Sequence, residues 1–347
     1  MQLLNKSDIA RLRQLLDQAS NVVITTHMSP DGDALGSSLG LANALYAMGK
    51  DAKVIVPDHP SQQLSFLPNF KYIEIFCSNP EFSTKQIAQA DIVFCLDYNA
   101  LSRIDRMAKA VEESPAPKVM IDHHLDPQPF CDITFSQSDC SSASLLTFKV
   151  LCALELADAI DRDVAQCLLA GMMTDTGNFS FNANDPYIYK ATAELVSRGA
   201  DKDRLTKLLF DTFSADCLRL NAYAISNKMD VWENRGAALI TLNRKELNEH
   251  HYRPGYTEGL VNKPLAIPRV VYSVFLREET EYIKVSMRSK GDFPCDVICA
   301  KYFNGGGHRN AAGGEFRGSM EQCVIVFKSL LDPNYENYIK NNRNIPI

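Results

Sequence analysis

The first half of the chain alternates short apolar runs with helical patterns. Runs rich in β-branched residues, such as NVVITT at 21–26 and DIVFCL at 91–96, have the length of buried strands. This alternation is typical of a doubly wound, mainly parallel α/β sheet. We predict strands at 21–26, 52–56, 91–96 and 118–121, and helices over 33–48 and from about 142.

The helix expected over 33–48 shows which face it buries. Leu35, Leu39, Ala42 and Tyr46 recur at spacings of 4, 3 and 4, which places them on one stripe. We expect this stripe to pack on the sheet and Gly49 to end the helix.

The pattern changes in the second half. Residues 186–230 have helical patterns of mixed charge and are expected to connect a first domain, 1–185, to a second one. From 231 to 332, strands such as PRVVYSVFLRE come first and helices follow. This order is typical of a smaller α+β domain with a mixed or antiparallel sheet. Residues 333–347 have the composition of a polar tail.

Length and composition suit a globular protein of two domains. The chain has 347 residues, of which 36 are basic and 42 acidic, so the net charge is −6. This balance argues against a long basic groove for duplex or extended single-stranded nucleic acid, but not against a small anionic substrate. No apolar run approaches the roughly 18 residues of a bilayer span, and the amphipathic start lacks the apolar core of a signal peptide. We therefore expect a cytoplasmic protein with no membrane partner.

The ten cysteines form no CxxC pair, and several lie inside apolar runs such as DIVFCLD. We interpret them as buried reduced thiols rather than disulfides or zinc ligands. That usage suits a reducing compartment.

Four clusters of histidine and aspartate carry the candidate chemistry, and each follows an apolar run. The first is HMSPDGD, with His27, Asp31 and Asp33. Taken alone, it is explained more readily as a turn in which Asp33 caps the next helix. The second is Asp97, at the end of DIVFCLD, where a lone aspartate is ordinarily a turn or cap residue.

The third cluster is Asp122, His123 and His124, at the end of KVMIDHH. Adjacent imidazoles after a buried strand are harder to explain structurally, because in a tight site each needs a partner. The fourth is Asp175 in MMTDTGNF, where the structural alternative is a turn that ends a helix, with Gly177 at positive φ.

Together the clusters outweigh these alternatives, because three of the four fall at the carboxyl ends of predicted strands, where open α/β sheets bind ligands. Several aspartates at one edge repel one another unless cations neutralise them. Two or more imidazoles with several carboxylates suit Mn²⁺, Co²⁺ or Fe²⁺ better than Ca²⁺ or Mg²⁺. We therefore expect two divalent cations, preferably Mn²⁺, arranged for displacement at phosphorus.

The second domain contributes a glycine run that ends in a histidine: Gly305, Gly306, Gly307 and His308. Such a run lets backbone N–H groups approach an anion and adds a side-chain donor. By itself it is ordinarily a flexible connection. Arg288, in the strand YIKVSMRS, has the reach to hold a phosphate with two hydrogen bonds, and its alternative is a solvated strand face.

Taken in order, the HxxxDxD, Asp, DHH and TDTG clusters and the later GGGH run resemble the DHH phosphoesterases that carry a DHH-associated C-terminal domain. Within that family, the order and spacing over nearly the whole chain are similar to the oligoribonucleases of very short RNA (nanoRNases) that also dephosphorylate 3′-phosphoadenosine 5′-phosphate (pAp). No motif position is broken.

The resemblance implies a metal role for most of the cluster residues. One cation would be held by His27, Asp31 and Asp97. The other would be held by Asp33, Asp97, His123 and Asp175, with Asp97 bridging the two.

The resemblance also implies which residues act on the substrate. Asp122 would orient an imidazole, and His124 would face the substrate phosphate and help protonate the leaving group, so that these two and Asp97 form the catalytic set. The substrate-binding residues of the second domain would be Arg288, Gly305, Gly306, Gly307 and His308.

The implied activity is manganese-dependent hydrolysis of short oligoribonucleotides to mononucleotides, of pAp to AMP, or of both, by a metal-bridging hydroxide. A second domain across from the metals would limit the length of the substrate. A homodimer is compatible with the sequence. The alternatives are a relative acting on cyclic dinucleotides or linear pApA, an inorganic pyrophosphatase, which the glycine run disfavours, and a nucleotide-binding regulator without turnover, which is expected to have lost a ligand position.

Overall fold

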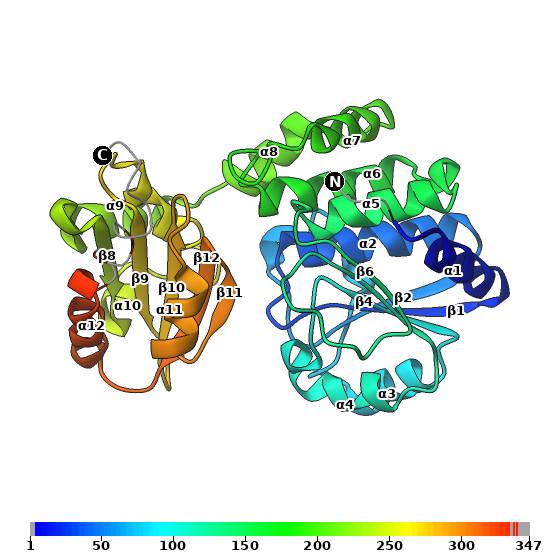
Figure 1. The fold of residues 1–347 in the computed structure, drawn as a ribbon, viewed down its shortest axis with the longest axis horizontal. Coiled ribbons are helices and arrows are strands. Elements are labelled where there is room, and N and C mark those ends of the chain that lie inside the picture. The colour runs from blue at the N-terminus through cyan, green and yellow to red at the C-terminus, as the bar shows by residue number, and fades with distance from the viewer. Residues whose placement is uncertain (1–3, 334–335, 337, 339–347) are drawn as a thin grey trace. The chain divides into compact units, whose positions relative to one another are not determined.

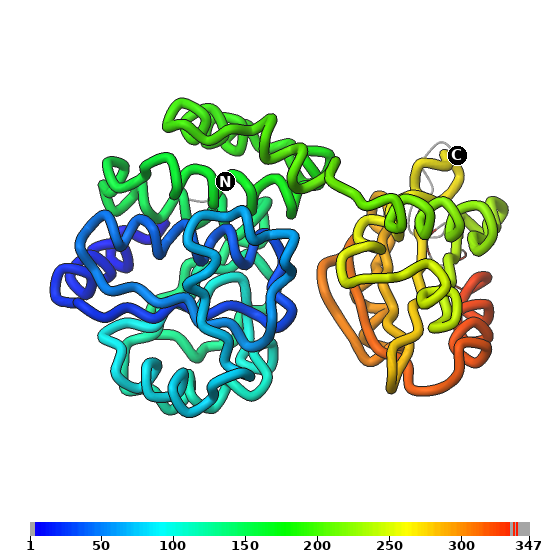
Figure 2. The backbone as a smooth tube through the Cα atoms, turned by 180° about the vertical axis from the view of Figure 1, so that it is seen from behind, coloured from blue at the N-terminus to red at the C-terminus, as the bar shows by residue number. Residues whose placement is uncertain are grey.

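The computed structural model describes residues 4–333, 336 and 338, so most of the tail expected at 333–347 lies outside the described residues. The chain forms two compact units, Met1–Thr212 and Phe213–Ile347. Figure 2 shows that the backbone completes the first unit before it enters the second. The two units are described separately below.

The first unit is built on a parallel sheet with the strand order β3-β2-β1-β4-β5-β6. The order reverses between β1 and β4, which makes this the switch point of a doubly wound fold, where ligands gather. The predicted fold class and the four predicted strands are confirmed. The strands are β1 (Asn21–Thr25), β2 (Asp51–Val56), β3 (Glu74–Ile75), β4 (Ile92–Leu96), β5 (Lys118–Asp122) and β6 (Ile133–Ser136).

Helices cover both faces of this sheet (Figure 1). One face carries α1 (Lys6–Gln18), α2 (Gly32–Ala47), α5 (Ala143–Ala153) and α6 (Arg162–Asp175), and the other carries α3 (Pro80–Ala88) and α4 (Ala108–Glu113). Short 3₁₀ segments lie at Gln62–Leu64, Phe70–Tyr72, Leu101–Met107, Ala157–Ala159, Glu233–Arg235 and Leu260–Ala266.

Helix α2 is buried all round, which differs from the single stripe that its spacing predicts. Every residue from Gly32 to Leu45 is buried, because α5 and α6 pack on the side that faces away from the sheet. Tyr46 is partly exposed and donates a hydrogen bond to the carbonyl of Ala52. The predicted end is observed, since Gly49 has a φ of 76° and follows the last turn.

The segment 186–230, expected as a connection, is divided between the units. Helices α7 (Pro186–Ser197) and α8 (Lys202–Phe210) bury Leu195 and Leu205 in the core of the first unit. Helix α9 (Ala215–Asn227) packs its Leu220 and Ala224 in the second. The boundary between the units therefore falls at Thr212, within this segment.

The second unit holds a mixed sheet with the order β11-β12-β10-β9-β8-β7, in which only the β8 and β9 pair is parallel among the pairs described. One face packs on α11 and α12, and part of the other packs on α9 and α10. The strands are β7 (Met229–Trp232), β8 (Ala237–Leu242), β9 (Tyr272–Glu278), β10 (Ile283–Ser289), β11 (Gly306–His308) and β12 (Ala311–Phe316); the helices are α10 (Arg244–Glu249), α11 (Cys295–Tyr302) and α12 (Met320–Ser329).

The glycine run is a strand rather than a flexible loop. Gly306 and Gly307 belong to β11, which pairs with β12. A Cβ on Gly305 would lie 1.9 Å from the carbonyl oxygen of Gly313, and one on Gly307 2.6 Å from that of Ala311. The glycines are needed here because two backbones approach too closely for side chains.

None of the helices in the described part of the chain combines the length and apolar content that a bilayer span requires. All ten cysteines lie within the described part and are free.

The contact between α2 and α6 yields a test of the packing. A Cβ on Gly36 would lie 2.7 Å from the backbone oxygen of Cys167, whereas the closest atoms to one on Gly40 would belong to the side chain of Leu168, with Cδ2 at 2.6 Å. Both changes to alanine gain about 1 kcal/mol of helix propensity. We expect Gly36→Ala to destabilise the protein by about 1–3 kcal/mol and Gly40→Ala to lie within about 1 kcal/mol of the wild type. Urea unfolding followed by circular dichroism measures both, and equal stabilities would contradict this packing.

Candidate metal centre

The predicted site residues of the first unit lie at one edge of its sheet. His27 follows β1, Asp97 follows β4, and Asp122 is the last residue of β5, so parallel pairing places them side by side. Two helix ends reach the same edge: α2 begins next to Asp31, and α6 ends at Asp175.

His27 forms a group with Asp31 and Asp97. Its Nε2 lies 3.4 Å from Asp97 Oδ2 and 4.0 Å from Asp31 Oδ1. Its Nδ1 lies 2.7 Å from the carbonyl oxygen of Met28, so Nδ1 carries the hydrogen of the neutral ring. The lone pair of the neutral imidazole is then at Nε2, directed at the carboxylates.

His123 forms the corresponding group on the other side of Asp97. Its Nε2 lies 3.5 Å from Asp97 Oδ1, 3.6 Å from Asp175 Oδ2 and 3.9 Å from Asp33 Oδ2. Its Nδ1 lies 3.1 Å from the carbonyl oxygen of Cys140. As with His27, a backbone carbonyl holds Nδ1 and leaves Nε2 to the site.

Asp97 is shared by the two groups. It is 2% exposed, and its backbone adopts the left-handed region with a φ of 59°. Its Oδ2 faces His27 and its Oδ1 faces His123. Oδ1 is fully buried and has no hydrogen-bond partner among the described residues. A buried carboxylate oxygen without a donor is costly unless a cation or proton satisfies it.

Asp31 and Asp33 support the fold as well as the site. The turn considered from the sequence would have Asp33 as the cap of the next helix, but the structure shows a different arrangement. Asp31 is the residue that caps α2, because its Oδ1 accepts hydrogen bonds from the backbone N–H groups of Asp33 and Ala34, both at 3.0 Å. Asp33 instead accepts from the first N–H groups of α5, those of Ala143 at 2.6 Å and Ser144 at 2.9 Å. The positive end of α5 thus holds this buried carboxylate.

His124 is oriented by Asp122. The Nδ1 of the imidazole lies 2.8 Å from Asp122 Oδ1, and its backbone N–H donates to Asp122 Oδ2 at 3.0 Å. Asp122 is completely buried. The carboxylate therefore fixes both the ring and the chain of His124.

The buried carboxylates of the site outnumber its positive charges, and this imbalance shifts the pKa values of the site residues. Burial, together with Asp97 and Asp175, raises the pKa of Asp33 well above its usual range. Burial also acts against the ionised form of Asp97, but the adjacent imidazoles of His123 and His27 lower its pKa well below that range. Burial opposes the imidazolium of His27, yet Asp97 and Asp31 outweigh it and raise the pKa of His27 to about 9. The pKa of His123 is also raised, because Asp97, Asp175 and Asp33 outweigh its burial.

These residues fit a pair of divalent cations. The groups His27, Asp31, Asp97 and Asp33, His123, Asp175 each place one ligand atom per residue within 4.8 Å of the others. The unsatisfied oxygen of Asp97, a member of the first group, faces His123 of the second. Imidazole Nε2 atoms with carboxylate oxygens are a ligand set for first-row divalent metals.

Comparison with known proteins shows which family the chain resembles. The model of the DHH family N-terminal domain matches residues 21–172, and that of the DHHA1 domain matches residues 242–332. The bifunctional oligoribonuclease and PAP phosphatase NrnA of Thermus thermophilus is 33% identical over 86% of this chain and 84% of its own length. The chain belongs to the DHH family. All of the first-unit site residues except Asp175 lie inside the matched DHH segment.

Two further relatives of this DHH protein differ in sequence identity and in the share of their own length that the match covers. The crystal structure of an exopolyphosphatase-related protein from Bacteroides fragilis has a TM-score of 0.94 and 44% identity, and the match covers 97% of this chain and 98% of that one. The cyclic-di-AMP phosphodiesterase GdpP of Bacillus subtilis is 23% identical over 95% of this chain, which spans 50% of the relative's length.

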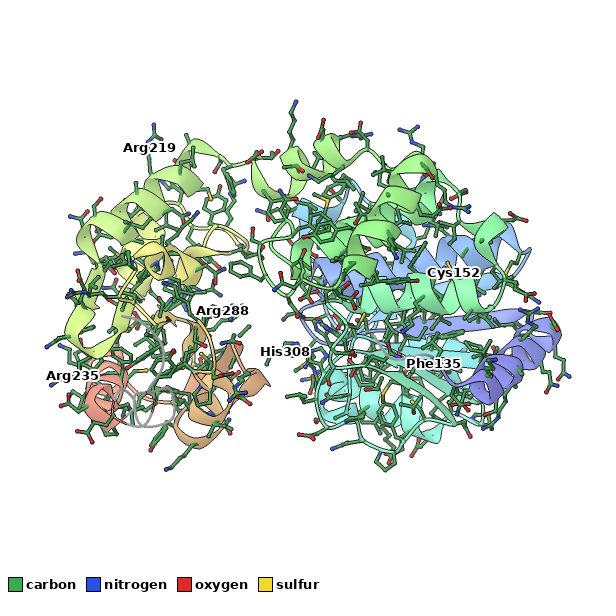
Figure 3. All side chains as sticks on the ribbon, turned by 45° about the horizontal axis from the view of Figure 1, so that its top comes forward. Phe135, Cys152, Arg219, Arg235, Arg288 and His308 are labelled. Atoms are coloured by element: carbon green, nitrogen blue, oxygen red, sulfur yellow. The ribbon has the colours of Figure 1, made fainter. Side chains whose placement is uncertain are left out.

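In the DHHA1 unit, two of the predicted substrate residues share one face of the sheet. Arg288 on β10 and His308 on β11 both pair with Ala311 of β12, so all three side chains point to the same side. Two strand spacings separate Arg288 from His308, which is about 10 Å. The small side chain of Ala311 lies between them in the register of the sheet. Figure 3 labels both side chains within this unit.

Sequence reasoning missed several residues that position the site. Gly171 of α6 is required next to Asp33, because a Cβ there would lie 2.9 Å from Asp33 Oδ1 and 1.9 Å from Ser144 Oγ. A glycine inside a helical pattern is the signal that could have revealed it. Asn99 also escaped notice; it donates a hydrogen bond to the carbonyl of Leu125, at 2.6 Å, and so supports the loop that follows His124.

Metal binding should release protons. Since the pKa of His27 is about 9 and that of His123 is also raised, both imidazoles carry an additional proton at pH 7 when no cation is bound. A cation at Nε2 displaces that proton, so affinity should increase with pH up to about 9. Calorimetric titration with Mn²⁺ at pH 7, in buffers of different ionisation enthalpy, measures the number released.

The matched control for this titration is His59→Gln, which changes an exposed histidine beside Ser78. That variant should behave as wild type, while His27→Gln should release fewer protons. Identical heats in all buffers for the wild type would contradict the assigned protonation.

Proposed function

We propose that this DHH protein hydrolyses phosphate esters of short oligoribonucleotides and of pAp, using two divalent cations. The observation that carries the proposal is the buried Asp97 carboxylate, which lies between the Nε2 atoms of His27 and His123 with one oxygen unsatisfied. The similarity to NrnA of Thermus thermophilus over most of both chains supports the substrate class.

Within this proposal the two groups of ligands hold one cation each. His27, Asp31 and Asp97 would hold the first, and Asp33, Asp97, His123 and Asp175 would hold the second. When bound, such cations supply a water of lowered pKa and neutralise charge that develops on the phosphoryl oxygens. The backbone carbonyls at His27 Nδ1 and His123 Nδ1 keep both imidazoles in the ligand tautomer. We propose Mn²⁺ as the preferred cation, because imidazole and carboxylate ligands are mixed.

His124 is proposed to act on the substrate rather than on a cation. Its Nδ1 is held by Asp122, so Nε2 is the atom directed to the substrate phosphate. A proton held there can be given to the leaving oxygen. Asp122 is a positioning residue, because it sets the ring through Nδ1 and is itself completely buried.

The DHHA1 unit is proposed to bind the remainder of the substrate on the face that Arg288 and His308 share. Guanidinium and imidazole groups are donors suited to a phosphate or sugar oxygen. Gly306 faces open space, so its backbone is accessible to a ligand. The adjacent residues Gly305 and Gly307 allow the two strands to approach closely and are proposed to keep this edge flat.

A cyclic-dinucleotide or pApA phosphodiesterase is the second candidate, and the likeness to GdpP favours it. It ranks below the first because identity to that relative is lower and the match covers half of its length, against 84% of the Thermus thermophilus protein.

The free cysteines support the cytoplasm as the compartment.

Substitution of Asp97 tests the shared carboxylate. Asp97→Asn keeps the size of the side chain but removes the charge, so we expect hydrolysis of pAp and of a dinucleotide to fall by at least about 10³-fold. Activity would be measured with Mn²⁺ on pAp, di- and pentanucleotide RNA, pApA and cyclic di-AMP, with circular dichroism to verify folding. Near-normal turnover in a folded variant would end the two-cation proposal, and preferential turnover of cyclic di-AMP by the wild type would favour the second candidate.

Changes on the DHHA1 face should separate substrate binding from metal binding. Loss of a charge-assisted hydrogen bond costs about 1.5–3 kcal/mol. We therefore expect Arg288→Ala and His308→Ala to raise the KM for pAp by about 10- to 100-fold and to leave Mn²⁺ stoichiometry unchanged. Arg309→Ala is the control, because Arg309 lies in the turn between β11 and β12 and is ion-paired with Asp292 at 3.4 Å. Loss of bound metal in His308→Ala would contradict the assignment.

A further inference from the structure

The loop that follows Asp175 has an unusual backbone. Gly177, Asn178 and Phe179 have φ values of 54°, 56° and 64° in succession. Glycine adopts this left-handed region without strain, but a bulky residue such as phenylalanine pays about 1–3 kcal/mol. Strain of this kind persists only where the surrounding structure enforces it.

Thr176 enforces the loop conformation. This completely buried residue accepts hydrogen bonds from the backbone N–H of Phe179 at its Oγ1, at 3.0 Å, and from those of Ser180 and Phe181 at its carbonyl, both at 2.9 Å. Its hydroxyl donates in turn to the carbonyl of Met172, at 2.6 Å. Every residue from Phe179 to Phe181 is therefore tied to the end of helix α6.

The loop that follows Asp175 also carries an exposed aromatic ring. Phe181 is 54% exposed, and its ring lies against the backbone of Gly177, where a Cβ would be 2.8 Å from Cδ2. Gly177 is two residues after Asp175, so their Cα atoms are at most about 7 Å apart. Phe179, by contrast, turns inward to the core of the first unit.

Two other exposed apolar side chains adjoin site residues. Met28 directly follows His27 and is 43% exposed, and Leu125 directly follows His124 and is 47% exposed. Hydrogen bonds fix the backbone at both positions: the Met28 N–H donates to the carbonyl of Arg103 at 2.8 Å, and the side-chain amide of Asn99 donates to the carbonyl of Leu125 at 2.6 Å. An apolar side chain therefore adjoins three of the four clusters.

A phosphate group makes no favourable contact with apolar side chains, whereas the flat face of a nucleobase does. Stacking of a base on an aromatic ring is worth about 1–3 kcal/mol and tolerates any base, because every base has a π-face. A methionine sulfur also makes favourable contacts with aromatic rings.

We propose that Phe181 stacks on a nucleobase of the substrate, with Met28 and Leu125 as the apolar rim, and so selects nucleotides over phosphate esters that lack a base. The inference rests on the proposed function. It makes Phe181 a specificity residue whose contribution to binding is independent of the sequence of the substrate.

Kinetics with a matched pair of substrates tests the role in specificity. For Phe181→Ala we expect the KM for pAp to rise by about 5- to 100-fold, with kcat little changed and with no effect on the abasic analogue, in which hydrogen replaces adenine. Phe181→Tyr should restore the KM. The control is Phe82→Ala, which removes an exposed phenylalanine of helix α3 and should match the wild type. Equal loss of activity by Phe181→Ala on both substrates would overturn the proposal.

A binding measurement separates this inference from the proposed activity. The chain contains a single tryptophan, so the fluorescence of F181W can be compared with that of the wild type. With Mg²⁺ present, AMP should quench the additional emission of F181W, and ribose 5-phosphate should not. No quenching by AMP would overturn the stacking proposal whether or not pAp is hydrolysed. Quenching by AMP in a protein that hydrolyses neither pAp nor RNA would instead refute the proposed function.

Discussion

The carboxylate of Asp97 is buried between the imidazoles of His27 and His123, and the rest of the site is arranged around it. Each of these residues stands just after one of three adjacent parallel strands. Burying a carboxylate is unfavourable unless positive charge accompanies it. The two imidazoles supply part of that charge, and a pair of cations would supply the remainder. The three strand ends lie together because β1, β4 and β5 are neighbours in the sheet.

The site and the fold depend on the same carboxylates. Asp31 caps helix α2, and Asp33 caps helix α5, while both face the imidazoles. The close contact of α2 with α6 at Gly36 and Gly171 brings Asp175 to the same edge. Removal of Asp31 or Asp33 would therefore also remove hydrogen bonds to the first turn of a helix, which makes Asp97→Asn, a change in charge alone, the better probe of the chemistry.

The two units differ in the chemistry of the surfaces described here. The first has a centre of charge with exposed apolar side chains beside it, and its strained loop at Phe179 is held by one buried threonine. The second has a flat sheet face where Arg288 and His308 flank a small alanine. Phosphate and sugar oxygens suit the polar surfaces, and a base suits the apolar one.

The sequence alone determined four of the six strands of the first unit, the parallel arrangement of its sheet and the residues of the four clusters, but it did not predict the short strands β3 and β6. These follow from local rules, because apolar periodicity reports strands and helices and polar residues at strand ends report a binding edge. It also determined the family, since the clusters occur in a specific order.

Only the tertiary structure decided how those residues are used. Helix α2 shows one apolar stripe but is buried all round, because α5 and α6 cover its other side. Asp33 caps α5, a helix 110 residues further along the chain. The glycine run is a strand because β12 approaches it too closely for side chains. Each of these depends on contacts between distant segments, which the local pattern of residues does not encode.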